Sequence, residues 1–164
     1  MISTDGLARL VLTGVGATVV MDVWSVIQRN LGIPTLDYAM VGRWVGHLFK
    51  GRFAHISIGK AESIPGERPL GWAIHYAVGI GFAAFLVSVY GLAWLHDPSW
   101  LPALATGTVT VVIPFFVMQP ALGAGIAASR TPSPWKNRLL SLLTHAIFGV
   151  GLYLSASLLK VVWK

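Results

Sequence analysis

Two histidines within the apolar stretches of this chain share one pattern. "HYAVGIG" at 75–81 and "HAIFGVG" at 145–151 both read His-x-x-x-Gly-x-Gly. An ionisable group inside a membrane costs about 2.5–3.5 kcal/mol on insertion scales, so such a residue is a functional candidate by default. Asp22 lies in a third apolar stretch. Because two imidazoles and a carboxylate suit zinc or iron, His75, His145 and Asp22 are candidate metal ligands.

Residues near these histidines extend the candidate site. Gly79 and Gly149 each lie one helical turn after a histidine, where glycine leaves room either for close helix packing or for a ligand beside the imidazole. Gln119 directly precedes Pro120, so its amide can bind a ligand or cap a carbonyl that the proline leaves free. The sequence therefore predicts an intramembrane polar pocket with these ligand-binding residues: Asp22, His75, Gly79, Gln119, His145 and Gly149.

Carboxylates supply the candidates for catalysis. Asp22 or Glu67 would be the natural general base of an enzyme, and Glu67 lies eight residues before His75. The segment 29–69 also contains candidates for a lid, although isolated residues of these types are usually solvated: His47, His55, Glu62 and Glu67. The chain has no cysteine, which excludes disulfides, thiolate ligands and cysteine nucleophiles. It also lacks the nucleophile elbow, the phosphate loop and the zinc-protease motif.

Transmembrane helices must position these residues, because the chain is too apolar for an ordinary soluble protein. Of its 164 residues, 55% are hydrophobic and 11% are charged, against about 25% charged in typical soluble domains. Four stretches reach the roughly 20 apolar residues that cross a hydrocarbon core, and they cover residues 7–28, 70–94, 101–128 and 138–161. We therefore expect an all-α integral membrane four-helix bundle in a single transmembrane domain, 1–164.

The third of these spans is expected to be bent. Pro114 and Pro120 lie within it, and each removes a backbone donor and clashes with the carbonyl four residues earlier. Lipid cannot satisfy a freed carbonyl, so the run at 118–129 should pack against other helices. Broken helices of this kind are also typical of transporters.

The connection at 29–69 is long enough to contain structure of its own. An apolar residue recurs at every fourth position from Leu36 to Leu48, which predicts an interfacial amphipathic helix over about residues 36–50. Such a helix either forms an ordinary surface element or covers the pocket as a lid.

The shared histidine motif indicates an internal repeat. If the two histidines are equivalent, the chain consists of two parallel two-helix repeats, 1–94 with the loop 29–69 and 101–164. A symmetry axis along the membrane normal then relates the repeats and places equivalent residues at equal depth. The four polar candidates should therefore lie at one level of the membrane.

Charged residues in the connections predict the orientation. Nine of the 12 Lys and Arg residues lie in the connections 29–69 and 129–138, and cytoplasmic loops are the ones enriched in these residues. Both connections should be cytoplasmic and both termini outside. The net charge of +6 therefore reflects topology, and the expected partner is the lipid bilayer rather than nucleic acid.

Three functions remain open from the residues alone. The one we favour is binding of a metal ion, or of a small or lipidic ligand, in a cytoplasm-facing intramembrane pocket, with or without catalysis. The second is a small transporter or channel, which with four helices would act as a homodimer. The third is a b-type haem protein with His75 and His145 as axial ligands. A divalent metal is favoured over haem as cofactor, because electron transfer across a bilayer usually needs two haems.

Three strings also carry a family resemblance. "MQPALGAG" before "THAIFGVGLYL", together with "GWAIHY" at the start of the second span, resembles a family of small four-span bacterial inner-membrane proteins of unknown function. The resemblance implies a location in the bacterial inner (plasma) membrane. It carries no activity and no catalytic residues.

Overall fold

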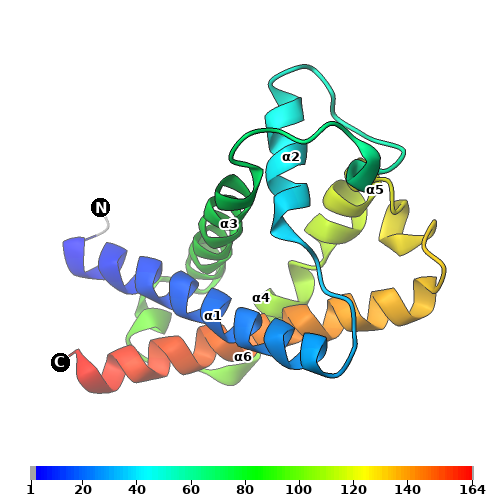
Figure 1. Ribbon diagram of the computed structural model, residues 1–164. Helices are drawn as coiled ribbons and strands as arrows, with labels where there is room; N and C mark the ends of the chain where they lie inside the picture. Colours follow the sequence, from blue (N-terminus) through cyan, green and yellow to red (C-terminus); the bar gives the residue numbers. More distant parts are fainter. Residues whose placement is uncertain (1–2, 164) are drawn as a thin grey trace. The chain divides into compact units, whose positions relative to one another are not determined.

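The computed structural model describes residues 3–163, and every regular element in that part of the chain is helical. Four helical segments there are long and apolar enough to cross a membrane: Thr4–Asn30 (α1), Glu67–Tyr90 (α3), Trp100–Leu122 and Pro134–Val162 (α6) (Figure 1). Shorter elements lie between them: Tyr38–Leu48 (α2) and the 3₁₀ turns Ile58–Lys60 (η1), Leu92–Leu95 (η2) and Ile126–Ala128 (η4). The chain is therefore an all-α, multi-pass membrane protein, as its composition predicts.

The predicted spans are correct in place but differ at their ends. The second span ends at Tyr90 rather than at residue 94, because Gly91 adopts a φ of +86° and η2 follows as a separate turn. The third span ends at Leu122 rather than at residue 128, because Gly123 adopts a φ of +98°. Glycine takes this left-handed conformation without steric cost and so ends helices. Hydropathy does not detect these ends, since the residues beyond them remain apolar.

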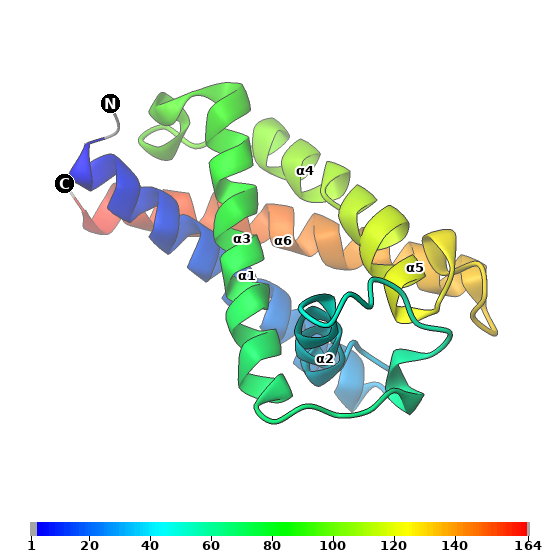
Figure 2. The ribbon, with the colours of Figure 1, turned by 90° about the horizontal axis from the view of Figure 1, so that it is seen from above.

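The third span is interrupted, as its prolines predict. It consists of α4 (Trp100–Val109), a π-helical segment at Pro114–Met118 (η3) and the short α5 (Gln119–Leu122) (Figure 2). The N–H of Gln119 donates to the Pro114 carbonyl, five residues earlier. The chain thus accommodates the proline with a wider helical turn.

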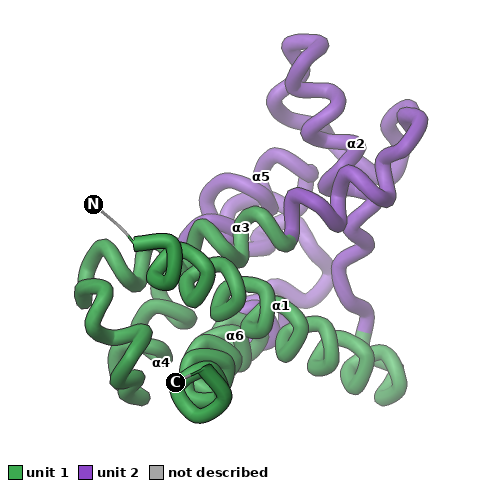
Figure 3. The backbone as a smooth tube through the Cα atoms, turned by 90° about the vertical axis from the view of Figure 1, so that its left-hand side faces the viewer, with its two compact units in different colours: residues 1–33, 76–110, 143–164 green, residues 34–75, 111–142 purple. Residues whose placement is uncertain are grey.

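The chain divides into two compact units (Figure 3). Unit 1 consists of residues 1–33, 76–110 and 143–164, and unit 2 consists of residues 34–75 and 111–142. The helices α3 and α6 each contribute to both units. Because each unit combines segments from both halves of the chain, neither unit is one of the two predicted repeats.

Close backbone contacts hold the helices of unit 1 together. A Cβ atom added at Gly14 of α1 would lie 2.6 Å from Ile80 Cα of α3, and one added at Gly107 of α4 would lie 2.5 Å from Gly149 Cα of α6. Real Cβ contacts are essentially never this short, so neither Gly14 nor Gly107 leaves room for a side chain. The α1–α3 and α4–α6 pairs thus use the same kind of contact. Larger side chains fill the core around them, including Leu86, Phe148 and Leu152.

The first turns of α1 and the last turns of α6 are tied together within unit 1. Arg9 is only 5% exposed, and it donates to the Asp5 carboxylate (3.0 Å) and to the backbone carbonyls of Leu159 (3.4 Å) and Trp163. A buried guanidinium requires such partners. Arg9 thereby ties the start of α1 to two carbonyls at the end of α6 and just beyond it. Figure 1 shows the blue start of α1 beside the red end of α6.

The helix predicted over about residues 36–50 of the first connection is present in unit 2 as α2, and it is shorter at both ends. Leu36 lies before α2 and is exposed, and the buried residues of α2 are Ala39, Val41, Gly42 and His47. A Cβ atom added at Gly42 would overlap the backbone carbonyl of Glu67 at the start of α3. Close backbone approach, which requires a small residue, therefore decides which face is buried.

The glycine contact between α4 and α6 can be tested with a matched pair of variants. Gly107→Ala should destabilise the protein by about 1–3 kcal/mol, because the added methyl group overpacks the contact with Gly149. Gly81→Ala is the control, since a Cβ atom at Gly81 has nothing within 4 Å. Alanine is the better helix former by about 1 kcal/mol, so this variant should be neutral or stabilising. Thermal unfolding in detergent micelles measures both, and equal melting temperatures would contradict the contact.

Candidate functional site

His145 lies in the core of unit 1 with a hydroxyl partner. It is a buried residue of α6, and its Nδ1 lies 3.0 Å from Thr110 Oγ1, at the end of α4. Thr110 Oγ1 in turn donates a hydrogen bond to the Gly107 carbonyl (2.7 Å). A hydroxyl has only one proton to donate, so in the neutral imidazole Nδ1–H must donate to Thr110. The lone pair of His145 is then on Nε2.

This tautomer makes Nε2 the nitrogen that is available for chemistry. A neutral imidazole accepts a hydrogen bond, binds a metal or takes up a proton through its unprotonated nitrogen. In metal sites, a ligating histidine commonly donates a hydrogen bond from its other nitrogen, which fixes the orientation of the ring. The hydrogen bond from Nδ1 to Thr110 orients the ring of His145 in the same way. Among the candidates, His145 is therefore the residue whose tautomer the hydrogen bonds define.

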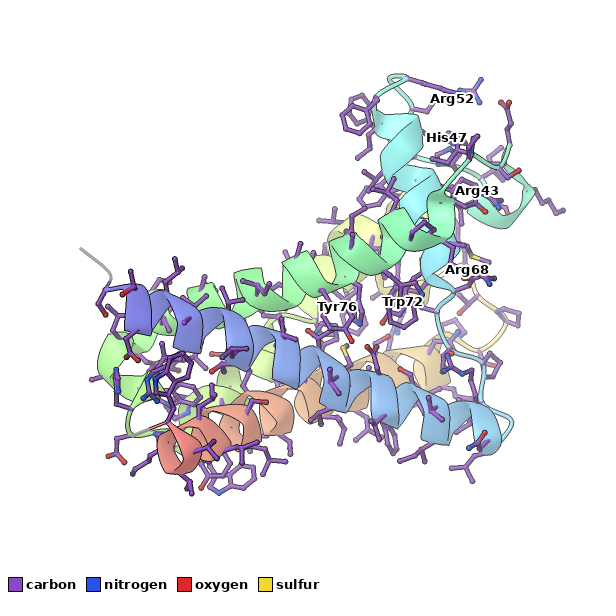
Figure 4. The ribbon with its side chains drawn as sticks, turned by 60° about the vertical axis from the view of Figure 1, so that its left-hand side comes forward. Arg43, His47, Arg52, Arg68, Trp72 and Tyr76 are labelled. Atoms are coloured by element: carbon purple, nitrogen blue, oxygen red, sulfur yellow. The ribbon has the colours of Figure 1, made fainter. Side chains whose placement is uncertain are left out.

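Asp22 has a partner on the facing helix of unit 1. Tyr76 of α3 donates its hydroxyl proton to the Asp22 carboxylate on α1, at 2.9 Å. Both side chains are half-buried, so the phenol supplies a donor that a carboxylate needs in an apolar region. Figure 4 shows Tyr76 on α3, one turn along the helix from Trp72.

His75 packs against aromatic rings within unit 2. Its ring stacks on Tyr38 of α2 with centroids 4.0 Å apart at 26°, and it meets Trp72 edge-on at 5.8 Å and 70°. The Tyr38 and Trp72 rings are themselves 4.7 Å apart. Edge-to-face contacts such as that of Trp72 with His75 are favourable between aromatic rings. The structure therefore places His75 in an aromatic cluster that joins α2 to α3.

Gln119 is a half-satisfied polar residue of unit 2. Its amide nitrogen donates to Ser141 Oγ of α6 at 3.3 Å. Its buried Oε1 has no hydrogen-bond partner among the described residues. An unpaired buried acceptor costs about 1–3 kcal/mol, so this oxygen is suited to accept a hydrogen bond from a ligand.

Glu67 forms an ion pair in unit 2. Arg43 of α2 donates from Nε and Nη2 to the two carboxylate oxygens, at 2.9 and 2.7 Å. The side chains of Arg43 and Glu67 are only 14% and 17% exposed. Arg43 Nη1 also donates to the Ile58 and Ala61 carbonyls at 3.1 Å each, and the hydrogen bond with Glu67 raises the pKa of Arg43 above its ordinary value. This ion pair joins α2 to the start of α3. Because its carboxylate is already engaged by Arg43, Glu67 is a weaker candidate for a general base.

The other lid candidates consist of a histidine pair and a surface residue. His47 Nδ1 lies 2.8 Å from His55 Nε2, while Glu62 is exposed. In the neutral pair one of these nitrogens donates and the other accepts, so the two outer nitrogens keep one N–H and one lone pair. Both outer nitrogens are buried without a hydrogen-bond partner among the described residues.

Two further expectations concern the metal and the glycines. Within residues 3–163, no group of three or more His, Asp or Glu side chains could hold a metal ion. The structure thus adds no support to a metal site of His75, His145 and Asp22, which stays a prediction. Helix contacts fill the space beside the predicted ligand-binding glycines: Gly79 faces Thr18 of α1, and Gly149 faces the Ala103 carbonyl of α4.

The partners of these candidates are the residues that sequence reasoning missed. Tyr76 directly follows His75, and Thr110 is a hydroxyl residue within an apolar run. A search for polar residues in or beside the spans could therefore have found both Tyr76 and Thr110. Arg43 is separated from Glu67 by 24 positions, and no local pattern indicates that pairing.

The tautomer of His145 can be measured directly. We expect ¹⁵N NMR of histidine-labelled protein to show an Nδ1–H for His145, with the signal assigned by His145→Gln. Thr110→Val removes the acceptor and should shift the proton toward Nε2. Thr108→Val is the matched control, because Thr108 is an exposed residue of the same helix. An Nε2–H signal in the wild-type protein, or no change in Thr110→Val, would contradict the hydrogen-bond scheme.

Comparison with known proteins identifies one family. The sequence profile of the family described as "Protein of unknown function (DUF2938)" matches residues 11–159. Neither the curated proteins nor the solved structures contain a significant match to this chain.

Proposed function

The chain belongs to the DUF2938 family, whose function is unknown, so from its own residues we propose that it binds a small or lipidic ligand inside the membrane. The ligand donates a hydrogen bond to His145 Nε2, and its apolar part packs among the helices of unit 1. The Asp22 carboxylate supplies a second polar contact. If the bound molecule is turned over, Asp22 is the general base.

The orientation of His145 carries this proposal. A hydrogen bond between membrane helices stabilises by only about 0.6 kcal/mol on average. The Thr110 hydrogen bond alone is therefore a poor reason to place a histidine here. Nε2 of His145 has no hydrogen-bond donor among the described residues, and it is not one of their fully buried unpaired atoms, so a ligand that donates to it would supply the missing partner.

Native mass spectrometry of protein extracted from its own membrane in nanodiscs tests the proposal. We expect a bound small molecule on the wild-type protein, lost in His145→Ala and weakened in Asp22→Asn. His96→Ala is the control, because His96 is an exposed histidine outside the four spans. A wild-type protein without any bound molecule, or an adduct that survives His145→Ala, would rule this function out.

The same sample separates the kinds of ligand. Elemental analysis detects a divalent metal, and an absorption spectrum detects haem. A Soret band that vanishes in both His75→Ala and His145→Ala would establish the bis-histidine haem protein. A colourless protein expressed with ample haem would eliminate that alternative.

A transporter or channel is the second candidate, and the interrupted third span favours it. Within this span the chain passes from α4 into the π-helical η3 and then into the four-residue α5. Broken helices of this kind form the substrate sites of many transporters. Four helices are few for such a protein, so it would act as a homodimer. Solute flux into proteoliposomes that Asp22→Asn abolishes would support this candidate, and a strictly monomeric protein would count against it.

We also propose a bacterial inner-membrane location with both termini outside and the segment 29–69 in the cytoplasm. The excess of Lys and Arg in the two connections supports this orientation. A periplasm-dependent reporter fused after Lys164 should therefore be active, and a tag inserted at Lys60 should be reached only from the cytoplasm. The reverse result at both positions would invert the orientation.

A further inference from the structure

The loop that follows α2 exposes large apolar side chains outside the four spans. Phe49 is 89% exposed, Phe53 is 70% exposed and Ile56 is 95% exposed. We call residues 49–56 the tip of unit 2. An apolar cluster at such exposure is typical of a surface that meets another apolar phase.

Hydrogen bonds hold the backbone of the tip in place, so these side chains have defined positions on the surface. The carbonyl of His47, at the end of α2, accepts from the N–H groups of Lys50 (2.9 Å) and Arg52 (3.0 Å). Gly51, with a φ of +74°, makes the turn between them. Trp44 Nε1 then donates to the Phe53 carbonyl at 3.0 Å.

A second anchor fixes the far side of the tip. The His55 N–H donates to the Ala121 carbonyl at 2.9 Å, and the His55 ring is joined to His47. Gly123 allows this part of the loop to approach the end of α5 closely, because a Cβ atom at Gly123 would overlap the Ile56 carbonyl. Ile56 directly follows this anchored residue, and its side chain remains exposed.

The charges around the apolar residues are all of one sign. From residue 38 to residue 61 the chain has four Lys or Arg residues and no Asp or Glu. Arg43 is paired with Glu67, whereas Lys50, Arg52 and Lys60 are exposed and form no ion pair within residues 3–163. Figure 4 shows Arg52 at the outer end of the loop and Arg43 further back on α2. Exposed aromatic residues interleaved with cations match the interface of an anionic bilayer.

The connection also begins and ends at the membrane surface. It leaves α1 at Asn30 and enters α3 at Glu67, and both helices are spans. Residues 31–66 therefore remain beside one leaflet, so a lipid surface is always within reach of the tip.

We propose that the tip inserts into the interfacial layer of this leaflet and recognises anionic lipid headgroups. Phe49, Phe53 and Ile56 enter the layer, to a depth of about 5–10 Å. Lys50 and Arg52 bind the phosphate groups above them. The tip thus anchors unit 2 to the leaflet independently of the ligand that His145 binds.

The absence of native cysteine allows each position to be labelled alone. A nitroxide is placed on Phe53→Cys, or on Ser63→Cys as an exposed control, in protein reconstituted into vesicles. The vesicles contain phosphatidylcholine alone or an equal mixture with phosphatidylglycerol. We expect the ratio of oxygen to nickel-chelate accessibility at position 53 to rise several-fold in the mixed vesicles, and the ratio at position 63 to stay that of an aqueous site.

Charge reversal tests the electrostatic part of the proposal. Lys50→Glu with Arg52→Glu should return the label at position 53 to aqueous accessibility, whereas Lys136→Glu, at an exposed position in the first turn of α6, should not. Three results would overturn the proposal: equal accessibility at positions 53 and 63, insertion that does not depend on phosphatidylglycerol, or protection of position 53 from both reagents, which would mean that protein covers the tip.

Discussion

Direct contact between helix backbones determines where the polar groups of unit 1 lie. The contact of Gly107 with Gly149 sets the register of α4 against α6, and one turn further along this antiparallel pair Thr110 lies opposite His145. A larger residue at Gly107 would separate the helices and so lengthen that hydrogen bond as well. The α1–α3 pair follows the same scheme around Gly14. A change in how these helices pack would therefore also change the geometry of the candidate site.

Hydropathy and backbone chemistry were sufficient to predict most of the fold. Four apolar runs define the four spans, Pro114 predicts the interruption of the third, and a short periodic pattern locates α2. The buried face of α2 was not predictable, because it depends on how closely Gly42 approaches another helix. The Arg43–Glu67 ion pair was not predicted for a related reason, since no local sequence pattern links two residues so far apart.

For the candidate site, the sequence identified residues but not their surroundings. His75 and His145 share a motif, yet one stacks on Tyr38 and the other is hydrogen-bonded by Thr110. A repeated motif preserves residue types along one helix, whereas the partners come from other helices and loops that differ between the two halves. The equivalence of the two histidines and their common depth in the membrane stay predictions.

The bonds of Arg9 have a consequence for how the chain is assembled. Arg9 lies in α1, but the carbonyls of Leu159 and Trp163 that it bonds lie 150 and 154 positions later in the chain. N-terminal segments emerge from the ribosome first. Until α6 is complete, the guanidinium can pair only with Asp5 of its own helix and with water that its flexible stem reaches at the membrane surface. These two bonds of Arg9 can therefore form only after α6 has been translated.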